Sequence, residues 1–389
     1  MAPKTPSLSE EIMSEILLKL PIKLILQCKI LSKQYYSLIR SHFFIRRHLD
    51  LTRLTNNLYD KSILSPILTS ARLFDQRGHI EDLDIHLSQD SERRHIIYGP
   101  MDGLYCVIQR ENVFLRREIT VWNPTTREHF VLPSIPLFYD KSQENWVIEM
   151  LSNNVQFQRC SAFGFGYDRR TQDYKVVVIC RFVSCWSGDT MLDMSKTKSL
   201  YAFNINEGEW RNHDGLGVDP SYIESCIGVF VRGACHWIYA PTCSNSGYTI
   251  LAFDMSIESS INIPFPSLDE NECYDMSIVA FNDRLALIDG HGGEMVGSSS
   301  SFDVWVMAEY GVAESWSILY RVSLAPTIFG RSVGIIRGRF YVVEDKGCLT
   351  SYDLDSSECE RYNVLDVGIR GLLPYEESLV RINRSNLLA

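Results

Sequence analysis

Five short segments of this chain share one pattern, and their spacing limits the fold more than any other feature of the sequence. Each holds a small or β-branched residue, then an aromatic residue, and usually Asn or Asp before a turn. The aromatic residues are Trp122, Phe203, Phe253, Trp305 and Tyr352. They stand 81, 50, 52 and 47 residues apart, and the first interval holds an insertion at about residues 136–160. A period near 50 residues with several strands per unit is typical of kelch-like β-propeller blades.

A second pattern precedes three of these aromatic residues. Segments 231–237, 281–285 and 336–341 each read as a strand, a tight two-residue turn and a returning strand. Short turns of this kind between two strand-forming runs indicate β-hairpins. The two patterns together make five repeating units visible.

A sixth unit is expected from the two ends of the β-rich region. Residues 54–97 favour short strands near Ile63–Phe74 and Ile80–Leu87, and Ser378–Asn383 favours a C-terminal strand. Pairing these segments would close the ring by joining the chain ends. The predicted fold is therefore mainly β with a small α N-terminal domain, the β part being a kelch-like propeller of six irregular blades. A pair of packed β-sheets is the alternative.

The N-terminal region predicts three short helices. Ser9 can cap the first helix and Pro21 ends it, a second helix covers Leu24–Leu31, and Ser32 can cap the third. The apolar stripe of the first helix consists of Ile12, Ile16, Leu17 and Leu20. So few residues cannot bury this much apolar surface by themselves. Either the helices cap the β-domain or they form a docking surface for another protein, and the pattern leaves both open.

Charge divides the chain into two parts. Residues 1–53 hold nine Lys/Arg against four Asp/Glu, and the remainder holds 29 against 44, a net charge of −15. An acidic body disfavours nucleic acid, whose phosphates attract Lys and Arg, and it favours basic protein partners. Acidity that only keeps the protein soluble is the alternative.

The sequence contains no recognisable catalytic or metal-binding constellation. Its eleven cysteines form no CxxC pair, its nine histidines form no HxH or HxxxH pair, and GxSxG is absent. Asp289-Gly290-His291 precedes a polar segment and favours a loop between strands, while Asp168 and Asp173 flank a turn. His236 beside Trp237 favours a packed core histidine. We therefore predict no cofactor, no metal and no enzyme activity, which disfavours a propeller enzyme.

The remaining composition indicates a reducing compartment. The odd number of scattered cysteines suits free thiols, and the N-terminus lacks the apolar stretch of a secretory signal. No run approaches the roughly 18 apolar residues that span a bilayer. We expect a protein of the cytoplasm, or of the nucleus as well, with no membrane partner.

Two insertions and one acidic loop are candidate contacts for a protein target. Trp146 and Trp186 lie in irregular insertions, where binding residues concentrate. The acidic candidates are Asp269, Glu270, Glu272 and Asp275. A solvated loop is the alternative interpretation of this acidic stretch.

The N-terminal helices carry a more specific pattern. It comprises Leu8, Ile12, Glu15-Ile16-Leu17, Leu20-Pro21-Ile22-Lys23, Ser32-Lys33, Ser37-Leu38-Ile39, Phe44-Ile45 and His48-Leu49. In order and spacing this pattern resembles the F-box, a three-helix unit that binds the Skp adaptor of SCF ubiquitin ligases and, through it, a cullin. The adaptor-binding residues that the resemblance implies are Leu8, Ile12, Ile16, Leu17, Leu20, Pro21, Leu24, Leu31, Tyr35, Leu38 and Ile39.

Four positions depart from the F-box pattern. Ser9 stands in place of proline, Cys28 in place of an aromatic residue, Ile30 in place of cysteine, and Tyr35 in place of tryptophan. All but Ser9 remain apolar or aromatic, so we expect docking to the adaptor to survive.

The remainder resembles the plant F-box-associated domain. The stretches that carry this resemblance are ITVWNPTTREHFVLP, AFGFGYDRRTQDYKVVVI, SLYAFNINEGEW, CHWIY, ILAFDMSIE, DVWVMAEYGVAESWSILYRV and LTSYDLDSSE. The resemblance implies an F-box domain at residues 5–49, a linker or first strands at 50–97, and a substrate-recognition β-propeller at 98–383. The resemblance implies a non-catalytic substrate-recognition subunit of an SCF ligase.

Within that family, the stretches MDGLYCV, VWNPTT and WVMAEYGVAESW resemble those of pollen S-locus F-box proteins. This similarity implies that the propeller recognises non-self S-RNases, the basic secreted ribonucleases of the pistil. A receptor for a different plant protein, such as a defence or signalling protein, is the first alternative. A kelch-like interaction protein outside any ligase is the second.

Overall fold

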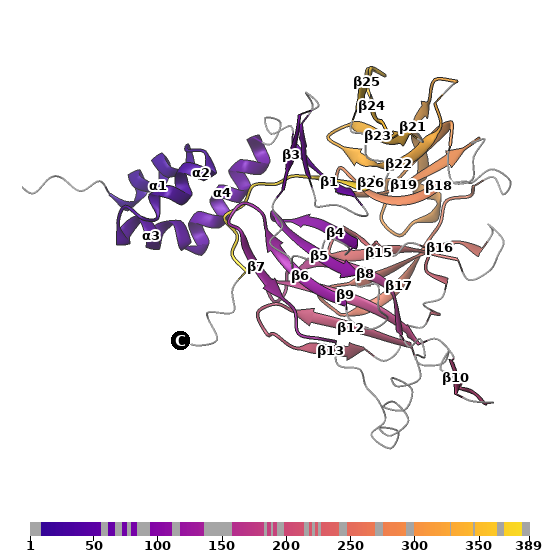
Figure 1. The fold of residues 1–389 in the computed structure, drawn as a ribbon, viewed down its shortest axis with the longest axis horizontal. Coiled ribbons are helices and arrows are strands. Elements are labelled where there is room, and N and C mark those ends of the chain that lie inside the picture. Colours follow the sequence, from indigo (N-terminus) through magenta and orange to yellow (C-terminus); the bar gives the residue numbers. More distant parts are fainter. Residues whose placement is uncertain are drawn as a thin grey trace, which may run out of the picture.

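A computed structural model shows a helical domain beside a β-propeller (Figure 1). The described residues are 9–55, 61–66, 72–75, 79–83, 94–110, 117–135, 158–182, 185–187, 190–192, 198–213, 218–219, 222–224, 227–240, 247–268, 275–292, 299–326, 328–344, 347–363 and 369–382. The first helices and the last strand are far apart in sequence, yet the segment after that strand returns to the helices.

The helical domain holds four helices in the described residues: α1 (Glu10–Leu18), α2 (Ile22–Cys28), α3 (Lys33–Arg40) and α4 (His42–Thr55). The predicted starts of the first and third helices are confirmed, because Ser9 and Ser32 cap α1 and α3 through their hydroxyl groups. The second helix, predicted at Leu24–Leu31, instead covers Ile22–Cys28. The structure adds α4 to the three predicted helices. Ser41 separates α3 from α4, and its hydroxyl accepts a hydrogen bond of 3.2 Å from Phe44 N.

The strands of the propeller form six four-stranded antiparallel sheets, which we number as blades. Blade 1 has β4 (Arg94–Met101), β5 (Leu104–Arg110), β6 (Arg117–Asn123) and β7 (Glu128–Val131). Blade 2 has β8 (Gln158–Asp168), β9 (Asp173–Phe182), β12 (Lys198–Asn204) and β13 (Trp210–His213). Blade 3 has β14 (Val229–Val231), β15 (Ala234–Tyr239), β16 (Thr249–Asp254) and β17 (Ser259–Pro264).

The other blades follow the same plan. Blade 4 has β18 (Asp275–Phe281), β19 (Arg284–His291), β20 (Ser301–Met307) and β21 (Trp316–Ser323), with the short 3-10 helix η5 (Ala313–Ser315) before its last strand. Blade 5 has β22 (Gly330–Ile336), β23 (Arg339–Glu344), β24 (Leu349–Asp353) and β25 (Cys359–Tyr362). Blade 6 has β26 (Ile369–Pro374), β1 (Lys61–Pro66), β2 (Arg72–Asp75) and β3 (Ile80–Asp82). A separate pair joins β10 (Cys185–Ser187) to β11 (Thr190–Leu192).

The inner strands form a closed ring. Each of β4, β8, β14, β18, β22 and β26 contacts the next, and β26 contacts β4. In blade 6, β26 pairs with β1 in antiparallel register, Pro374 opposite Ser62, so the two ends of the β-rich region close the ring as predicted. The closing strand is Ile369–Pro374, however, and the predicted strand at Ser378–Asn383 is wrong. Residues 375–382 run outside the sheets toward the helices.

The repeated aromatic–Asn/Asp pattern now has a physical explanation. Asn123 Oδ1 accepts hydrogen bonds from the backbone N–H groups two and three residues later, at 2.9 and 3.2 Å. Asp254 does the same at 2.7 and 2.9 Å, and Asp353 at 3.1 and 2.8 Å. Such Asx turns close the last hairpin of a blade, while the aromatic residue before each of them is buried. Trp305 precedes Val306 instead, and a longer connection with η5 follows it.

The two faces of the propeller carry different connections. Four blades begin with hairpins closed by two residues of positive φ, as type I′ turns require: Asp102-Gly103, Arg232-Gly233, Asn282-Asp283 and Arg337-Gly338. The two-residue turns predicted in three of these hairpins are thus confirmed. Asp102 contacts α4, so we call this side the helical face. Because every blade is a meander, its middle connection and the links between blades lie on the opposite face.

Candidate functional site

The helical domain has a small core of its own. Leu17, Ile22, Ile25, Leu38, Ile39 and Phe44 are buried in one apolar cluster. Three of the predicted adaptor contacts belong to this cluster, since Leu17, Leu38 and Ile39 are only 2%, 6% and 1% exposed. Their placement corrects the prediction for these residues, because side chains inside the core stabilise the helices rather than face a partner.

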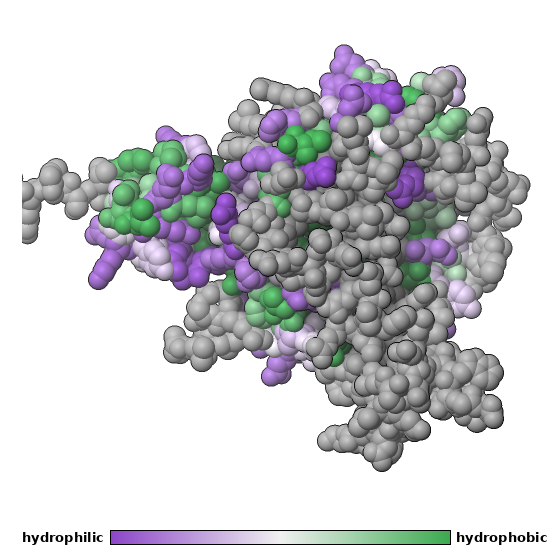
Figure 2. All heavy atoms as spheres, viewed as in Figure 1, coloured by the Kyte–Doolittle hydropathy of each residue, from purple (hydrophilic) through white to green (hydrophobic). Residues whose placement is uncertain are grey.

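The surface of α2 is apolar and hollowed. A depression of about 480 Å³, which we call the α2 hollow, is lined by Leu20, Leu24, Gln27, Cys28, Ile30 and Leu31. Leu24, Ile30 and Leu31 expose 44%, 87% and 68% of their surface. Figure 2 shows hydrophobic residues gathered on the outside of the helical domain. Covering these apolar groups with a partner would stabilise the complex by about 25 cal/mol for each Å² removed from water. The exposed surface therefore favours a docking role.

The other predicted adaptor contacts lie around the helices. Ile12 and Ile16 are exposed on α1, and Pro21 is exposed just before α2. Tyr35 is half-buried against the helical core. Leu8 lies outside the described residues. The sequence interpretation did not include Gln27 and Ile30 among the surface residues. Ile30 and Leu31 form an apolar pair shortly after α2 ends at Cys28, and such a pair outside a helix is the sequence signal that could have identified Ile30.

The helices also pack on the propeller through a polar network centred on Asp102. This buried carboxylate accepts hydrogen bonds from Arg46 (3.4 Å) and Arg53 of α4 and from the Tyr174 hydroxyl at 2.7 Å. Arg46 also donates to the Tyr167 hydroxyl at 2.6 Å. Burial, together with the neighbouring Asp102 charge, raises the pKa of Tyr174 well above its ordinary value. One carboxylate therefore joins α4 to blades 1 and 2.

The segment after β26 makes a second connection between the domains. The Asn123 side-chain amide donates to the carbonyl oxygens of Ser378 and Val380, at 3.1 and 2.7 Å. Between them, Leu379 is buried in the core of the helical domain, while Val380 is buried in a propeller cluster that also contains Leu49 of α4. The helices thus cap the β-domain, as one of the two alternatives holds, and still expose an apolar surface.

The predicted target contacts are placed only in part. Trp146, Asp269, Glu270 and Glu272 lie outside the described residues. Trp186 is in β10, opposite Met191 of β11. Asp275 begins β18, and its carboxylate accepts a hydrogen bond of 2.8 Å from Ser332 N in blade 5, so it holds two blades together. This contact corrects the prediction of Asp275 as an acidic group presented to a partner.

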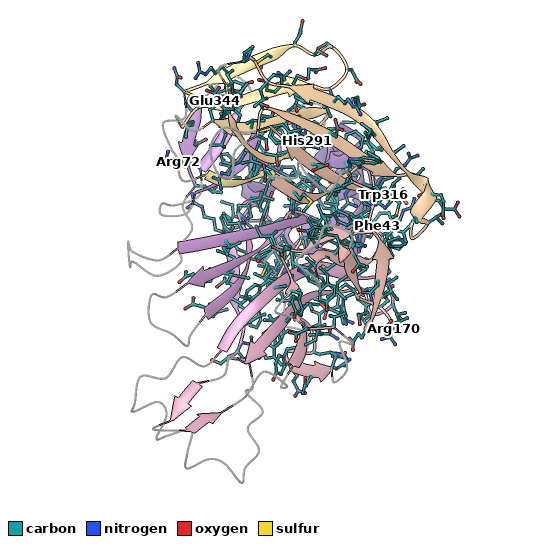
Figure 3. The ribbon with its side chains drawn as sticks, turned by 90° about the vertical axis from the view of Figure 1, so that its right-hand side faces the viewer. Phe43, Arg72, Arg170, His291, Trp316 and Glu344 are labelled. Carbon is teal, nitrogen blue, oxygen red and sulfur yellow. The ribbon has the colours of Figure 1, made fainter. Side chains whose placement is uncertain are left out.

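The remaining sequence candidates for chemistry serve the fold. Asp168 forms an ion pair of 2.8 Å with the fully buried Lys175, which confirms a structural turn rather than a catalytic carboxylate pair. His236 is buried and hydrogen-bonded to Val229 O and Tyr310, as predicted for a core histidine. The loop predicted at Asp289-Gly290-His291 is wrong, because these residues form the end of β19, where Figure 3 labels His291. In the described part of the chain, no group of three His, Cys, Asp or Glu could hold a metal ion, and no helix is long and apolar enough to cross a membrane.

Two plant F-box proteins are similar to most of this chain. An F-box/kelch-repeat protein of Arabidopsis thaliana is 26% identical over 364 residues, which cover 88% of this chain and 86% of the relative. The F-box protein CPR1 of the same plant is 22% identical over 381 residues, covering 92% of this chain and 84% of the relative. Among solved structures, a chain of the nidogen/laminin complex matches with a TM-score of 0.43 and 10% identity, covering 82% of this chain and 99% of that one.

Two family matches account for the two domains. Residues 6–47 match the F-box domain, and residues 72–374 match the F-box associated beta propeller domain. The second match alone covers well over half of the chain. This protein therefore belongs to the family of F-box proteins that carry an F-box associated β-propeller domain.

Proposed function

We propose that this chain is the substrate-recognition subunit of an SCF-type ubiquitin ligase, a non-catalytic subunit that docks to a Skp-type adaptor and presents a target protein for ubiquitination. The α2 hollow is the observation that carries this proposal, because it leaves three large apolar side chains exposed on a domain with its own core. A second protein that covered Leu24, Ile30 and Leu31 would remove this surface from water.

The arrangement of the propeller supports a separate place for the target. The helices occupy the helical face, where the first hairpins of four blades close in two-residue turns. The described strands on either side of the segments that contain Trp146, Trp186 and Asp269 end on the opposite face. One side of the molecule would then hold the adaptor and the other would hold the target. Longer connections on a rigid scaffold are where binding residues concentrate.

Adaptor binding can be tested with the full chain and a purified plant Skp-type adaptor. Replacing Leu24 and Leu31 by aspartate should weaken the complex by about 100-fold or more, since central interface residues often contribute 2 kcal/mol or more each. Leu319→Asp is the matched control, because Leu319 is 49% exposed on β21, far from the helices. Absence of a complex with the intact chain would contradict the proposal, as would unchanged binding by the double variant.

For the target, we propose a basic protein and, following the resemblance to pollen S-locus F-box proteins, a non-self S-RNase. The net charge of −15 beyond residue 53 would attract such a protein and speed encounter. Full-length chain immobilised on a support should retain S-RNases from pistil extract, and retention should weaken as salt rises. Capture of a defence or signalling protein instead, or expression in leaf rather than pollen, would favour the alternative target. The cytoplasm, or the nucleus as well, is the proposed location.

A further inference from the structure

Lysine is distributed very unevenly along this chain. Residues 1–53 contain five lysines and four arginines. Residues 199–345 contain seven arginines and no lysine, and only Lys346 follows to the C-terminus. Blades 3 and 4, with β22 and β23 of blade 5, therefore present no lysine at all. The same chain uses both cations in its helices, so a general shortage of lysine in the sequence does not explain the pattern.

The one propeller lysine whose side chain the structure describes is inaccessible. Lys175 Nζ lies in the interface of blades 2 and 3, 2.6 Å from Met255 O, 2.6 Å from Glu258 and 2.8 Å from Asp168. Its side chain has no exposed surface. This ammonium group is therefore bound by three oxygen atoms and shielded from any enzyme.

Among the propeller residues that the structure describes, the exposed Lys/Arg positions are arginines. Arg170, Arg232, Arg284 and Arg321 are exposed, and Arg170 lies at the edge of the propeller in Figure 3. Arg321 is 72% exposed and makes a single 3.3 Å contact with Asp303 through Nε, a pairing that a lysine ammonium could also provide. Arg321 forms no bidentate pair with a carboxylate, so the ion pair at this position does not require a guanidinium group.

The two cations differ in one chemical respect that matters to a ubiquitin ligase. The deprotonated Nζ of lysine attacks the thioester carbon that joins ubiquitin to a conjugating enzyme. A C–N isopeptide bond forms, the C–S bond breaks, the cysteine thiolate leaves and takes up a proton, and the second proton of the ammonium passes to water. Arginine stays protonated and offers no free electron pair for this attack, so it keeps the surface charge without being an acceptor.

We propose that residues 199–345 of the propeller are free of acceptor lysines so that the ligase modifies the bound target and spares this part of its own receptor. This inference rests on the proposed function, because it matters only for a chain held close to a charged conjugating enzyme. Proximity gives any amine on the receptor a high effective concentration, which would otherwise favour self-modification. The exposed lysines that remain in the described helical domain, Lys19, Lys23 and Lys33, lie on the domain that we propose to bind the adaptor.

The test is a reconstituted reaction with the full chain, adaptor, cullin–RING module, activating and conjugating enzymes and ubiquitin. A variant with Arg232→Lys, Arg284→Lys and Arg321→Lys keeps every charge and adds three exposed amines. Its self-modification should be at least about threefold faster than that of the wild type, with isopeptides mapped to the new lysines. The matched variant with glutamine at the same three positions should behave as the wild type.

Two results would overturn the inference. One is a lysine variant modified no faster than the wild type while the same mixture builds free ubiquitin chains. The other is a wild-type propeller that is already modified as fast as the helical domain. Adaptor binding, measured beforehand by co-elution, separates these results from failure of the proposed function: a chain that never joins the ligase would overturn the proposed function, and this inference with it.

Discussion

Arg46 of α4 donates a hydrogen bond of 2.6 Å to the hydroxyl of Tyr167 in β8, and its guanidinium lies 5.2 Å from the centre of that ring. The helical domain is thus attached to blade 2 as well as to blade 1, where Asp102 lies. Leu49 of α4 and Val380 share an apolar cluster with both blades. Such continuous packing predicts that the helices and the propeller unfold together, and that an adaptor bound to α2 keeps a constant position relative to the opposite face.

We predict that Asp102→Asn destabilises the protein by about 2 kcal/mol, because hydrogen bonds to a charged group contribute more than neutral ones. Asparagine tolerates the positive φ of 54° at this position, so the turn itself should persist. Urea unfolding followed by tryptophan fluorescence measures the change. Asp50→Asn on the exposed side of α4 is the control and should stay within about 0.5 kcal/mol of the wild type. Equal midpoints for both variants would contradict the prediction.

Leu379→Ala should destabilise the helical domain by about 2–5 kcal/mol, the usual cost of emptying a buried leucine site. Leu379 is 2% exposed within the cluster that holds Phe44 and Ile25. Hydrogen exchange of α1–α3 should accelerate, and adaptor binding should weaken on warming even though Leu379 lies outside the α2 hollow. Leu319→Ala, at an exposed site, is the control. Unchanged protection of α1–α3 would show that residue 379 does not support the helices in solution.

The propeller could be predicted because each repeat depends on interactions between residues that are close in sequence. An aromatic residue followed by Asn or Asp specifies a strand end and an Asx turn within a few residues, as at Asn123 and Asp353. The segment after β26 could not be assigned this way. Its apolar alternation at Leu379 and Val380 resembles a strand, but its backbone bonds the side chains of Asn123 and Thr125 from 250 residues away, which no local pattern reveals.

For the helical domain, the sequence predicted an exposed apolar surface but not which individual residues belong to it. Apolar residues surround α1 and α2 on several sides, so the sequence does not separate the core residue Leu17 from the exposed Ile16 beside it. That division depends on which face α3, α4 and Leu379 cover. Asp275 shows the same limit, because its acidic neighbours suggested an open loop while Ser332, 57 residues later, holds its carboxylate.

The unfolding free energy should decrease in acid because of Asp168. Burial alone would raise the pKa of Asp168, but hydrogen bonds from Lys175, Ser256 and Thr171 hold it well below its usual range. A carboxyl whose folded pKa is lowered stabilises the protein fully above its unfolded pKa of about 4, and this stability is lost as pH falls toward the folded value.

Asp168→Asn should therefore cost about 3 kcal/mol at pH 7, since the buried Lys175 keeps Glu258 but loses its fully buried carboxylate partner, and should reduce the slope of stability against pH below about pH 4. Chemical denaturation between pH 2.5 and 7 measures both effects. Glu209→Gln, at an exposed position in blade 2, should keep the wild-type slope. An unchanged acid slope in Asp168→Asn would mean that other carboxyls carry it.

Because of His236, the unfolding free energy should also depend on pH in a range closer to neutral. Its Nδ1 lies 3.1 Å from Val229 O and its Nε2 lies 2.7 Å from the Tyr310 hydroxyl. In the neutral ring, Nδ1–H donates to the carbonyl and Nε2 accepts from Tyr310. A proton on Nε2 would remove that acceptor. Burial lowers the pKa of His236 to about 4, so the folded protein keeps this histidine neutral where the unfolded chain, with a pKa near 6.5, begins to bind a proton.

Between those two values the unfolded chain binds more protons, so stability is complete above about pH 6.5 and falls as pH decreases toward 4. From pH 7.5 to 5 the wild type should lose about 2 kcal/mol through His236, at 1.36 kcal/mol for each pKa unit. His236→Gln should lose most of this slope; His48, whose pKa burial also lowers, leaves a remainder. His129→Gln, at an exposed site on β7, should keep the wild-type slope. Equal slopes in all three proteins would show that His236 does not titrate on unfolding.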